Sequence, residues 1–110
     1  MDYEQVLSRK LRLLFKNDAA RAEVIATLDA YGREEHERET SRVRLAILKL
    51  AGPDPDEIKK YTDAARQDYR DVLSWAEYPR QSKKGPVPDG PEKQKLVEAD
   101  RAEYEKWLTT

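Results

Sequence analysis

Apolar side chains recur every three or four residues along most of this chain, the spacing that places them on one face of an α-helix. Tyr3, Leu7, Leu11 and Leu14 form the first such stripe and predict a helix from about residue 2 to residue 16. Asn17 then interrupts the pattern and suits the N-cap of a second helix, because its side-chain oxygen can accept a backbone N–H. The pattern therefore predicts two consecutive helices joined by a short turn.

The second stripe is the longest and predicts a single helix from Asp18 to Ala51, which would be the central element of the fold. Its inner positions are Ile25, Leu28, Gly32, His36, Glu39, Thr40, Val43, Ile47 and Leu50. Gly52 and Pro53 end it, since glycine suits the position after a helix and proline cannot continue one. Such a helix would be about 50 Å long. We therefore expect either a bend at Gly32 or contact with another subunit.

A third helix is predicted from Asp54 to about residue 78, with Asp54 as its N-cap, Pro55 in its first turn and Pro79 after its end. Residues 79–91 are rich in proline and glycine and carry basic side chains, which indicates a linker. Residues 92–110 have a thin apolar stripe and predict a satellite helix. The predicted fold is all-α: an antiparallel helical hairpin or bundle of three to four helices with one long central helix, in which residues 1–78 form the core domain.

Composition limits the chain to one modest domain with wide solvated faces. Of 110 residues, 39% are charged and 38% hydrophobic, but the net charge is only -1, so periodic helices explain this composition better than disorder does. The absence of cysteine excludes disulfides and thiolate chemistry. With no membrane-length apolar run and no signal-peptide pattern, we expect a cytoplasmic protein. The near-zero charge argues against nucleic acid, leaving weak contact through Arg80, Lys83 and Lys84 as an alternative.

One polar group interrupts the predicted apolar faces. His36 and Glu39 fall on the inner stripe of the second helix, and antiparallel packing of the second and third helices would place Asp68 and Tyr69 opposite them. His36 could act as a general base or metal ligand oriented by a carboxylate. A histidine paired inside a helix interface explains the same residues, since buried polar groups need partners. This second interpretation carries more weight, because no other ligand-type neighbours accompany the histidine.

Two pairs of carboxylates raise a metal-dependent alternative. Glu34 and Glu37, and on the next predicted helix Asp68 and Asp71, are each three residues apart and so resemble the paired acidic motifs of all-α nucleoside-triphosphate pyrophosphohydrolases. The resemblance implies an enzyme in which these four residues hold Mg²⁺ against the phosphates. This sequence departs from that pattern, because the second pair begins with Asp rather than Glu and the pairs lie further apart. Glu34 and Glu37 would also face outward.

Two apolar features indicate a protein partner. Trp75, Tyr78 and Arg80 lie at the end of the third predicted helix, and these residue types dominate interface hot spots, although they could equally close the end of a bundle. Leu45 and Leu48 lie opposite the inner stripe, so the second helix is apolar nearly all round there and needs cover on a second side. The first or last helix or a second copy could supply that cover. The length of the predicted helix favours a homodimer.

The segment DYRDVLSWAEYPR, residues 68–80, resembles part of small bacterial helical proteins of unknown function, and the resemblance covers residues 40–80. It implies a bacterial cytoplasmic helical protein and brings no activity or site with it. The sequence has no glycine-rich phosphate loop and no nucleophile with a base beside it. It therefore predicts a non-enzymatic interaction or scaffold module without a cofactor, homodimeric and with an unidentified protein partner. The Mg²⁺-dependent hydrolase is the alternative.

Overall fold

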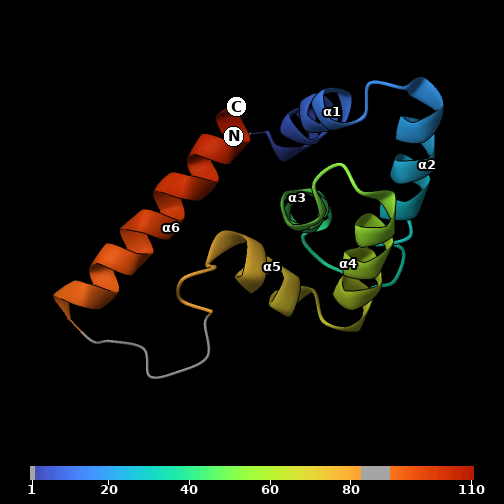
Figure 1. Cartoon of the computed structure of the whole chain (residues 1–110). Helices are drawn as coiled ribbons and strands as arrows, with labels where there is room; N and C mark the ends of the chain where they lie inside the picture. The colour runs from blue at the N-terminus through green and yellow to red at the C-terminus, as the bar shows by residue number, and fades with distance from the viewer. Residues whose placement is uncertain (1, 83–89) are drawn as a thin grey trace.

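The computed structural model describes residues 2–82 and 90–110, and within these ranges the chain is helical and has no β-strand (Figure 1). The helices are α1 (Tyr3–Leu14), α2 (Asp18–Leu28), α3 (Thr40–Ala51), α4 (Pro55–Gln67), α5 (Tyr69–Glu77) and α6 (Pro91–Thr109). The all-α class is therefore confirmed. None of the helices in the described ranges is long and apolar enough to cross a membrane. Residues 83–89, the middle of the predicted linker, lie outside the described residues.

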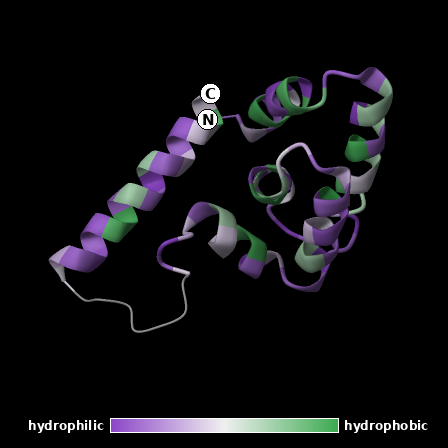
Figure 2. Cartoon of the chain, in the orientation of Figure 1, coloured by the Kyte–Doolittle hydropathy of each residue, from purple (hydrophilic) through white to green (hydrophobic). Residues whose placement is uncertain are grey.

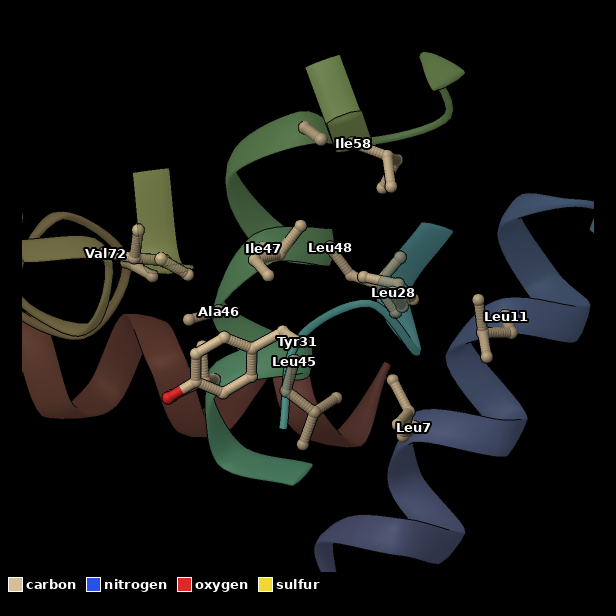
Figure 3. Packing of buried hydrophobic residues seen from close by; sticks show 14 of the residues in the cluster. Leu7, Leu11, Leu28, Tyr31, Leu45, Ala46, Ile47, Leu48, Ile58 and Val72 are labelled. Atoms are coloured by element: carbon tan, nitrogen blue, oxygen red, sulfur yellow. The ribbon is translucent and has the colours of Figure 1, made fainter. Parts of the chain in front are cut away.

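The core is built around α3, which packs against α1, α4 and α5, while α2 packs against α4. Figure 1 shows α3 end-on in the middle of this group of helices. Five side chains of α3 have no exposed surface: Val43, Leu45, Ala46, Ile47 and Leu48. Figure 3 shows the residues that close around them, including Leu7 and Leu11 of α1, Leu28 of α2, Ile58 of α4 and Val72 of α5. Helix α3 is apolar on most of its sides, and the neighbouring helices of the same chain cover these apolar sides.

The prediction of one long central helix is wrong. Helix α2 ends at Leu28, the next helix begins at Thr40, and residues 29–39 form a non-helical loop between them. The 29–39 loop interrupts the helix rather than bending it, because two of its residues have a positive φ. Gly32 has a φ of 104°, and Glu39, which precedes α3, has a φ of 54°. A helix of L-residues cannot pass through such conformations.

Packing explains why residue 32 is a glycine. A Cβ atom added to Gly32 would lie 2.7 Å from the Cγ2 atom of Thr40, at the start of α3. The loop is also fixed by Tyr31, which is fully buried and whose hydroxyl donates to the Arg38 carbonyl at 2.6 Å. Arg44 of α3 donates to the Tyr31 carbonyl at 2.7 Å. The break between α2 and α3 is therefore a packed feature of the fold.

The third predicted helix begins as expected but is divided. Asp54 is the N-cap of α4, its carboxylate accepts the backbone N–H of Asp56 at 2.9 Å, and Pro55 occupies the first turn. Asp68 has extended backbone and separates α4 from α5. Its carboxylate accepts the backbone N–H of Arg70 at 3.1 Å and so caps α5. Aspartate at this position starts a new helix because it satisfies an N–H that has no partner inside the helix.

Helix α6 docks along one side of the molecule and brings the two ends of the described chain together (Figure 1). The Arg9 guanidinium of α1 donates to the Leu108 carbonyl, and the Lys10 ammonium lies 4.4 Å from the centroid of the Trp107 ring. Figure 2 shows that α6 is mostly hydrophilic. Its buried face is short, with Tyr104 and Leu108 as the apolar contacts and Asp100 as a polar one. Polar contacts therefore carry much of the docking.

Candidate functional site

The structure brings three members of the predicted polar site together at the surface and leaves the fourth elsewhere. His36, Asp68 and Tyr69 line one hollow of about 260 Å³ beside the junction of α4 and α5. Glu39 lines a different groove, between α6 and the start of α1. The His36 side chain is 70% exposed, since it belongs to the 29–39 loop and not to an inner helix face. The expected buried histidine is therefore a surface histidine.

The residue that organises this region is Glu37, which the sequence placed only among outward-facing carboxylates. Its Oε1 accepts the backbone N–H groups of Gly32 at 2.8 Å, Arg33 at 3.1 Å and Glu34 at 3.4 Å. Its Oε2 lies 3.4 Å from the Nε atom of Arg66 on α4. Burial alone would raise the pKa of this carboxyl, but the backbone hydrogen bonds and Arg66 outweigh burial and lower the pKa.

The four carboxylates of the metal-dependent alternative do not gather into a metal site. Within residues 2–82 and 90–110, no group of three or more His, Asp and Glu side chains is placed to hold a metal ion. Glu37 is engaged by the loop backbone, and Asp68 by the start of α5, where the Arg70 side chain lowers the pKa of its carboxyl. Glu34 and Asp71 are exposed. Glu37 and Asp68 thus serve the backbone of a loop and a helix start in this fold.

The predicted partner surface is also divided by the structure. Leu45 and Leu48 have no exposed surface, so their assignment to a partner interface is wrong: α1, α4 and α5 supply the cover that these two side chains need. Trp75 and Tyr78, by contrast, are each 43% exposed, on or just after α5. Arg80 is half-buried and follows them. The aromatic part of the predicted surface therefore remains open to solvent in the single chain.

Trp75 lies at the centre of an aromatic surface, here called the Trp75 surface, which also comprises Leu50, Tyr61 and Pro79. The rings of Tyr61 and Trp75 meet edge to face, with centroids 6.4 Å apart and an interplanar angle of 68°. A hollow of about 400 Å³ adjoins Trp75 between Leu50 and Pro79. Trp75 therefore belongs both to an aromatic pair with Tyr61 of α4 and to the lining of a hollow that Leu50 and Pro79 share with three charged side chains.

Ion pairs of mixed sign border this hollow. Glu103 of α6 accepts from the Lys49 ammonium at 3.1 Å and lies 3.5 Å from the Arg80 guanidinium. Arg80 also donates to the fully buried Asp100 at 2.9 Å, and this bond is the main cause of the raised pKa of Arg80. Lys83 and Lys84, named with Arg80 as an alternative phosphate contact, lie outside the described residues. The border of the Trp75 surface is therefore charged but nearly neutral.

Comparison with known protein families, with curated proteins and with solved structures found no match to this chain. The resemblance of residues 68–80 to small bacterial helical proteins therefore stays a prediction. The expected cytoplasmic location and the division into core domain, linker and satellite helix stay predictions as well.

A second concave site lies between α6 and the N-terminal ends of α1 and α3. This tyrosine groove takes its name from Tyr3, Tyr78 and Tyr104, and it has a volume of about 550 Å³. In its lining, the Arg42 guanidinium binds both carboxylate oxygens of Glu77, at 2.8 and 2.6 Å. This bidentate bond raises the pKa of Arg42 further above its ordinary value. The groove combines aromatic walls with an ion pair in which Glu77 is buried and Arg42 is half-buried.

Sequence reasoning missed the buried charges that position these sites. Asp100 accepts from the backbone N–H groups of both Arg80 and Gln81 and from both of their side chains. Nothing in the spacing of α6 distinguishes Asp100 from its exposed acidic neighbours. Glu77 and Arg42 are equally ordinary in sequence, because their pairing joins α3 and α5 across 35 positions. Such pairs become visible only when the tertiary arrangement is known.

Proposed function

We propose that this chain is a non-enzymatic helical interaction module that forms a homodimer through the Trp75 surface. The observation that carries the proposal is the exposure of Trp75, which packs edge to face against Tyr61 and also lines a hollow. Tryptophan and tyrosine are enriched among the residues that dominate binding energy, and they are most effective when ringed by polar groups that exclude water. Lys49, Arg80 and Glu103 supply polar groups beside Trp75, in the lining of the same hollow.

The charge pattern favours a second copy of the chain as the partner. In a two-fold symmetric contact, the same surface meets itself, so a border of a single sign would repel its own copy. Here Arg80 and Glu103 lie on the same border and are only 3.5 Å apart. Each could therefore face the opposite charge of a symmetry-related molecule. A border with balanced charge meets this requirement, whereas a strongly acidic or basic partner would gain little from it.

Sedimentation equilibrium tests the proposal directly. The wild-type chain is expected to show a monomer–dimer equilibrium at tens of micromolar, and Trp75→Ala is expected to shift it toward monomer by at least about tenfold, the effect of losing one hot-spot side chain. Leu13→Ala is the matched control, because Leu13 is also an exposed apolar side chain but lies on α1. A wild-type chain that stays monomeric throughout this range would overturn the homodimer.

Tryptophan fluorescence gives a second readout that does not depend on hydrodynamics. The chain has only two tryptophans, and Trp107 is half-buried on α6. In a Trp107→Phe background, Trp75 is therefore the single reporter of its own surface. Its emission is expected to shift to shorter wavelength as protein concentration rises, because dimer formation removes the indole from water. An emission maximum independent of concentration, in a sample that sedimentation shows to dimerise, would place the interface elsewhere.

A further inference from the structure

Helix α6 contributes a charged side chain to the border of the Trp75 surface. Glu103 of α6 lines the hollow beside Trp75, whereas the other lining residues belong to α3, to α5 and to the segment that follows α5. The Glu103 carboxylate accepts from the Lys49 ammonium at 3.1 Å and lies 3.5 Å from the Arg80 guanidinium. The border of the Trp75 surface is therefore shared between α6 and the rest of the fold.

A fully buried carboxylate fixes α6 in this position. Asp100 has no exposed surface, and it lies three residues before Glu103, so the two carboxylates are neighbours on one face of α6. The Asp100 oxygens accept the backbone N–H groups of Arg80 and Gln81 and also the side-chain N–H groups of both residues. These four bonds, here called the Asp100 anchor, join α6 to the segment that lines the hollow with Arg80.

Outside the Asp100 anchor, α6 has few buried contacts. Tyr104 and Leu108 are its buried apolar side chains. The Lys10 ammonium lies 4.4 Å from the centroid of the Trp107 ring, and the Lys49 ammonium lies 5.5 Å from that of the Tyr104 ring. A helix with little buried apolar surface detaches from a fold more readily than a core helix does. Loss of the anchor should therefore shift α6 toward a detached state.

Docked α6 supplies the negative charges that balance the border of the Trp75 surface. Lys49 and Arg80 are the cations of the hollow, and among the described residues the carboxylates that pair with them are Asp100 and Glu103, both on α6. When α6 is detached, both cations lose these partners. In a two-fold symmetric contact they would then face the same charges of the second copy. Detachment of α6 thus changes a neutral border into one that repels its own copy.

We infer that docking of α6 controls self-association, because the Trp75 surface pairs with a second copy only while the Asp100 anchor holds Glu103 at its border. This regulation rests on the homodimer proposed for the Trp75 surface. By thermodynamic linkage, dimer formation in turn stabilises docked α6. Both copies must have α6 docked, so the dimer dissociation constant rises with the inverse square of the docked fraction. A docked fraction of about one third raises that constant about tenfold.

Hydrogen exchange of the full chain, followed by mass spectrometry, tests this linkage. The backbone amides of α6 are expected to exchange more slowly at protein concentrations above the dimer dissociation constant than below it. In Trp75→Ala, the rates over the same range are expected not to depend on concentration. Equal exchange of α6 in monomer and dimer would overturn the control by α6 and leave the homodimer intact. A wild-type chain that does not dimerise would overturn both.

Asp100→Ala separates docking from direct contact, because a fully buried side chain cannot touch a second copy. This variant is expected to speed the exchange of α6, with the α3 amides still protected, and to raise the dimer dissociation constant at least about tenfold. Glu37→Ala is the matched control, since it also removes a buried carboxylate but one that holds the 29–39 loop. It should leave the dissociation constant unchanged. Unaltered dimerisation of Asp100→Ala, despite faster exchange of α6, would refute the inference.

Charge variants at the border test the balance of charge while the Asp100 anchor stays in place. Glu103→Gln leaves Lys49 without its partner, and Lys49→Gln leaves Glu103 in excess, so each is expected to raise the dimer dissociation constant about two- to fivefold. The double variant restores neutrality and is expected to return within about twofold of wild type. Glu98→Gln, an exposed glutamate of α6 outside the hollow, should have no effect. A double variant whose loss equals the product of the two single losses would overturn the role of charge.

Discussion

Glu37 offers the sharpest test of how the 29–39 loop is held. We consider replacement by glutamine, which keeps the shape of the side chain, and by alanine, which removes it. The carboxylate accepts a short bond from Gly32, a normal one from Arg33 and a long one from Glu34. Glutamine retains one acceptor oxygen for these groups but loses the charge and turns an N–H₂ group toward Arg66. Alanine leaves all of the donors unpaired.

The expected cost follows from these distances. A hydrogen bond to a charged group contributes about 1.5–3 kcal/mol when well formed, and long bonds contribute little. The 2.8 Å bond from Gly32 and the 3.1 Å bond from Arg33 therefore account for most of the stabilisation that Glu37 provides. We expect Glu37→Ala to lower the free energy of unfolding by about 3 kcal/mol and Glu37→Gln by about 1–2 kcal/mol. Either loss is a large part of the total stability of a small domain, which is about 5–15 kcal/mol.

Acidic pH should reduce the difference in the free energy of unfolding between the wild-type chain and Glu37→Gln. The folded chain lowers the pKa of Glu37 below its ordinary value of 4.5. A carboxyl with a lowered folded-state pKa contributes stability that is fully present above the unfolded pKa and is lost as pH falls through the folded pKa. The difference in unfolding free energy is therefore expected to be constant from neutral pH to about pH 5, and to shrink below 4.5.

Urea denaturation followed by circular dichroism at neutral and acidic pH measures both effects. Glu35→Gln is the matched control, because Glu35 is an exposed glutamate of the same loop, and we expect it to change stability by less than about 0.5 kcal/mol. Glu37 does not hold the loop in this way if Glu37→Gln is as stable as this control, or if the loss of stability in Glu37→Gln grows on acidification. The metal-dependent alternative differs, since it assigns Glu37 to Mg²⁺ and predicts little effect of Glu37→Ala without metal.

Two further substitutions test other parts of the fold. Gly32→Ala is expected to lower the free energy of unfolding by about 1–3 kcal/mol, because φ is positive and the new methyl group would overlap Thr40; Thr40→Ser in the same chain should recover part of this loss in urea titrations. Asp100→Asn is expected to cost about 1–3 kcal/mol at neutral pH by weakening its bonds with Arg80 and Gln81. Since the folded chain lowers the pKa of Asp100, that cost should fall in acid, and thermal unfolding at neutral and acidic pH measures the change.

The helix boundaries that have strong local signals could be predicted from the sequence. Asn17 caps α2 through the backbone N–H of Ala20, and Asp54 with Pro55 starts α4. Both signals act within three residues, so they do not depend on the rest of the fold. Asp68 has the same chemistry, but it lies inside a longer apolar stripe whose spacing predicts one continuous helix, and that stripe hides its role as a cap.

The 29–39 loop could not be predicted, because tertiary contacts fix it. Its inner positions in the predicted helix were Gly32, His36 and Glu39, and a stripe this polar is compatible with either a buried polar site or a break in the helix. The deciding contacts are the bonds of Glu37 to the loop backbone and the burial of Tyr31. Neither has a sequence signal, since glutamate in a charged stretch is usually solvated.

The candidate surfaces show a similar limit. The apolar side chains of a helix such as α3 must be buried on every side. The sequence pattern does not indicate whether helices of the same chain or a second copy of the chain bury them. Leu45 and Leu48 are covered internally, whereas Trp75, with fewer apolar neighbours in sequence, remains exposed. The tyrosine groove was not anticipated as a site, because its walls come from residues 3, 78 and 104.

The central position of α3 has a consequence for how the chain unfolds. Because α1, α4 and α5 each cover part of the same helix, detaching any of them exposes leucine and isoleucine side chains that the others cannot cover. These helices should therefore melt together in one cooperative transition. Helix α6 adds only Tyr104 and Leu108 to the buried apolar core and is otherwise held by polar contacts such as the Arg80–Asp100 pair, so its backbone amides should exchange with deuterium before those of α3.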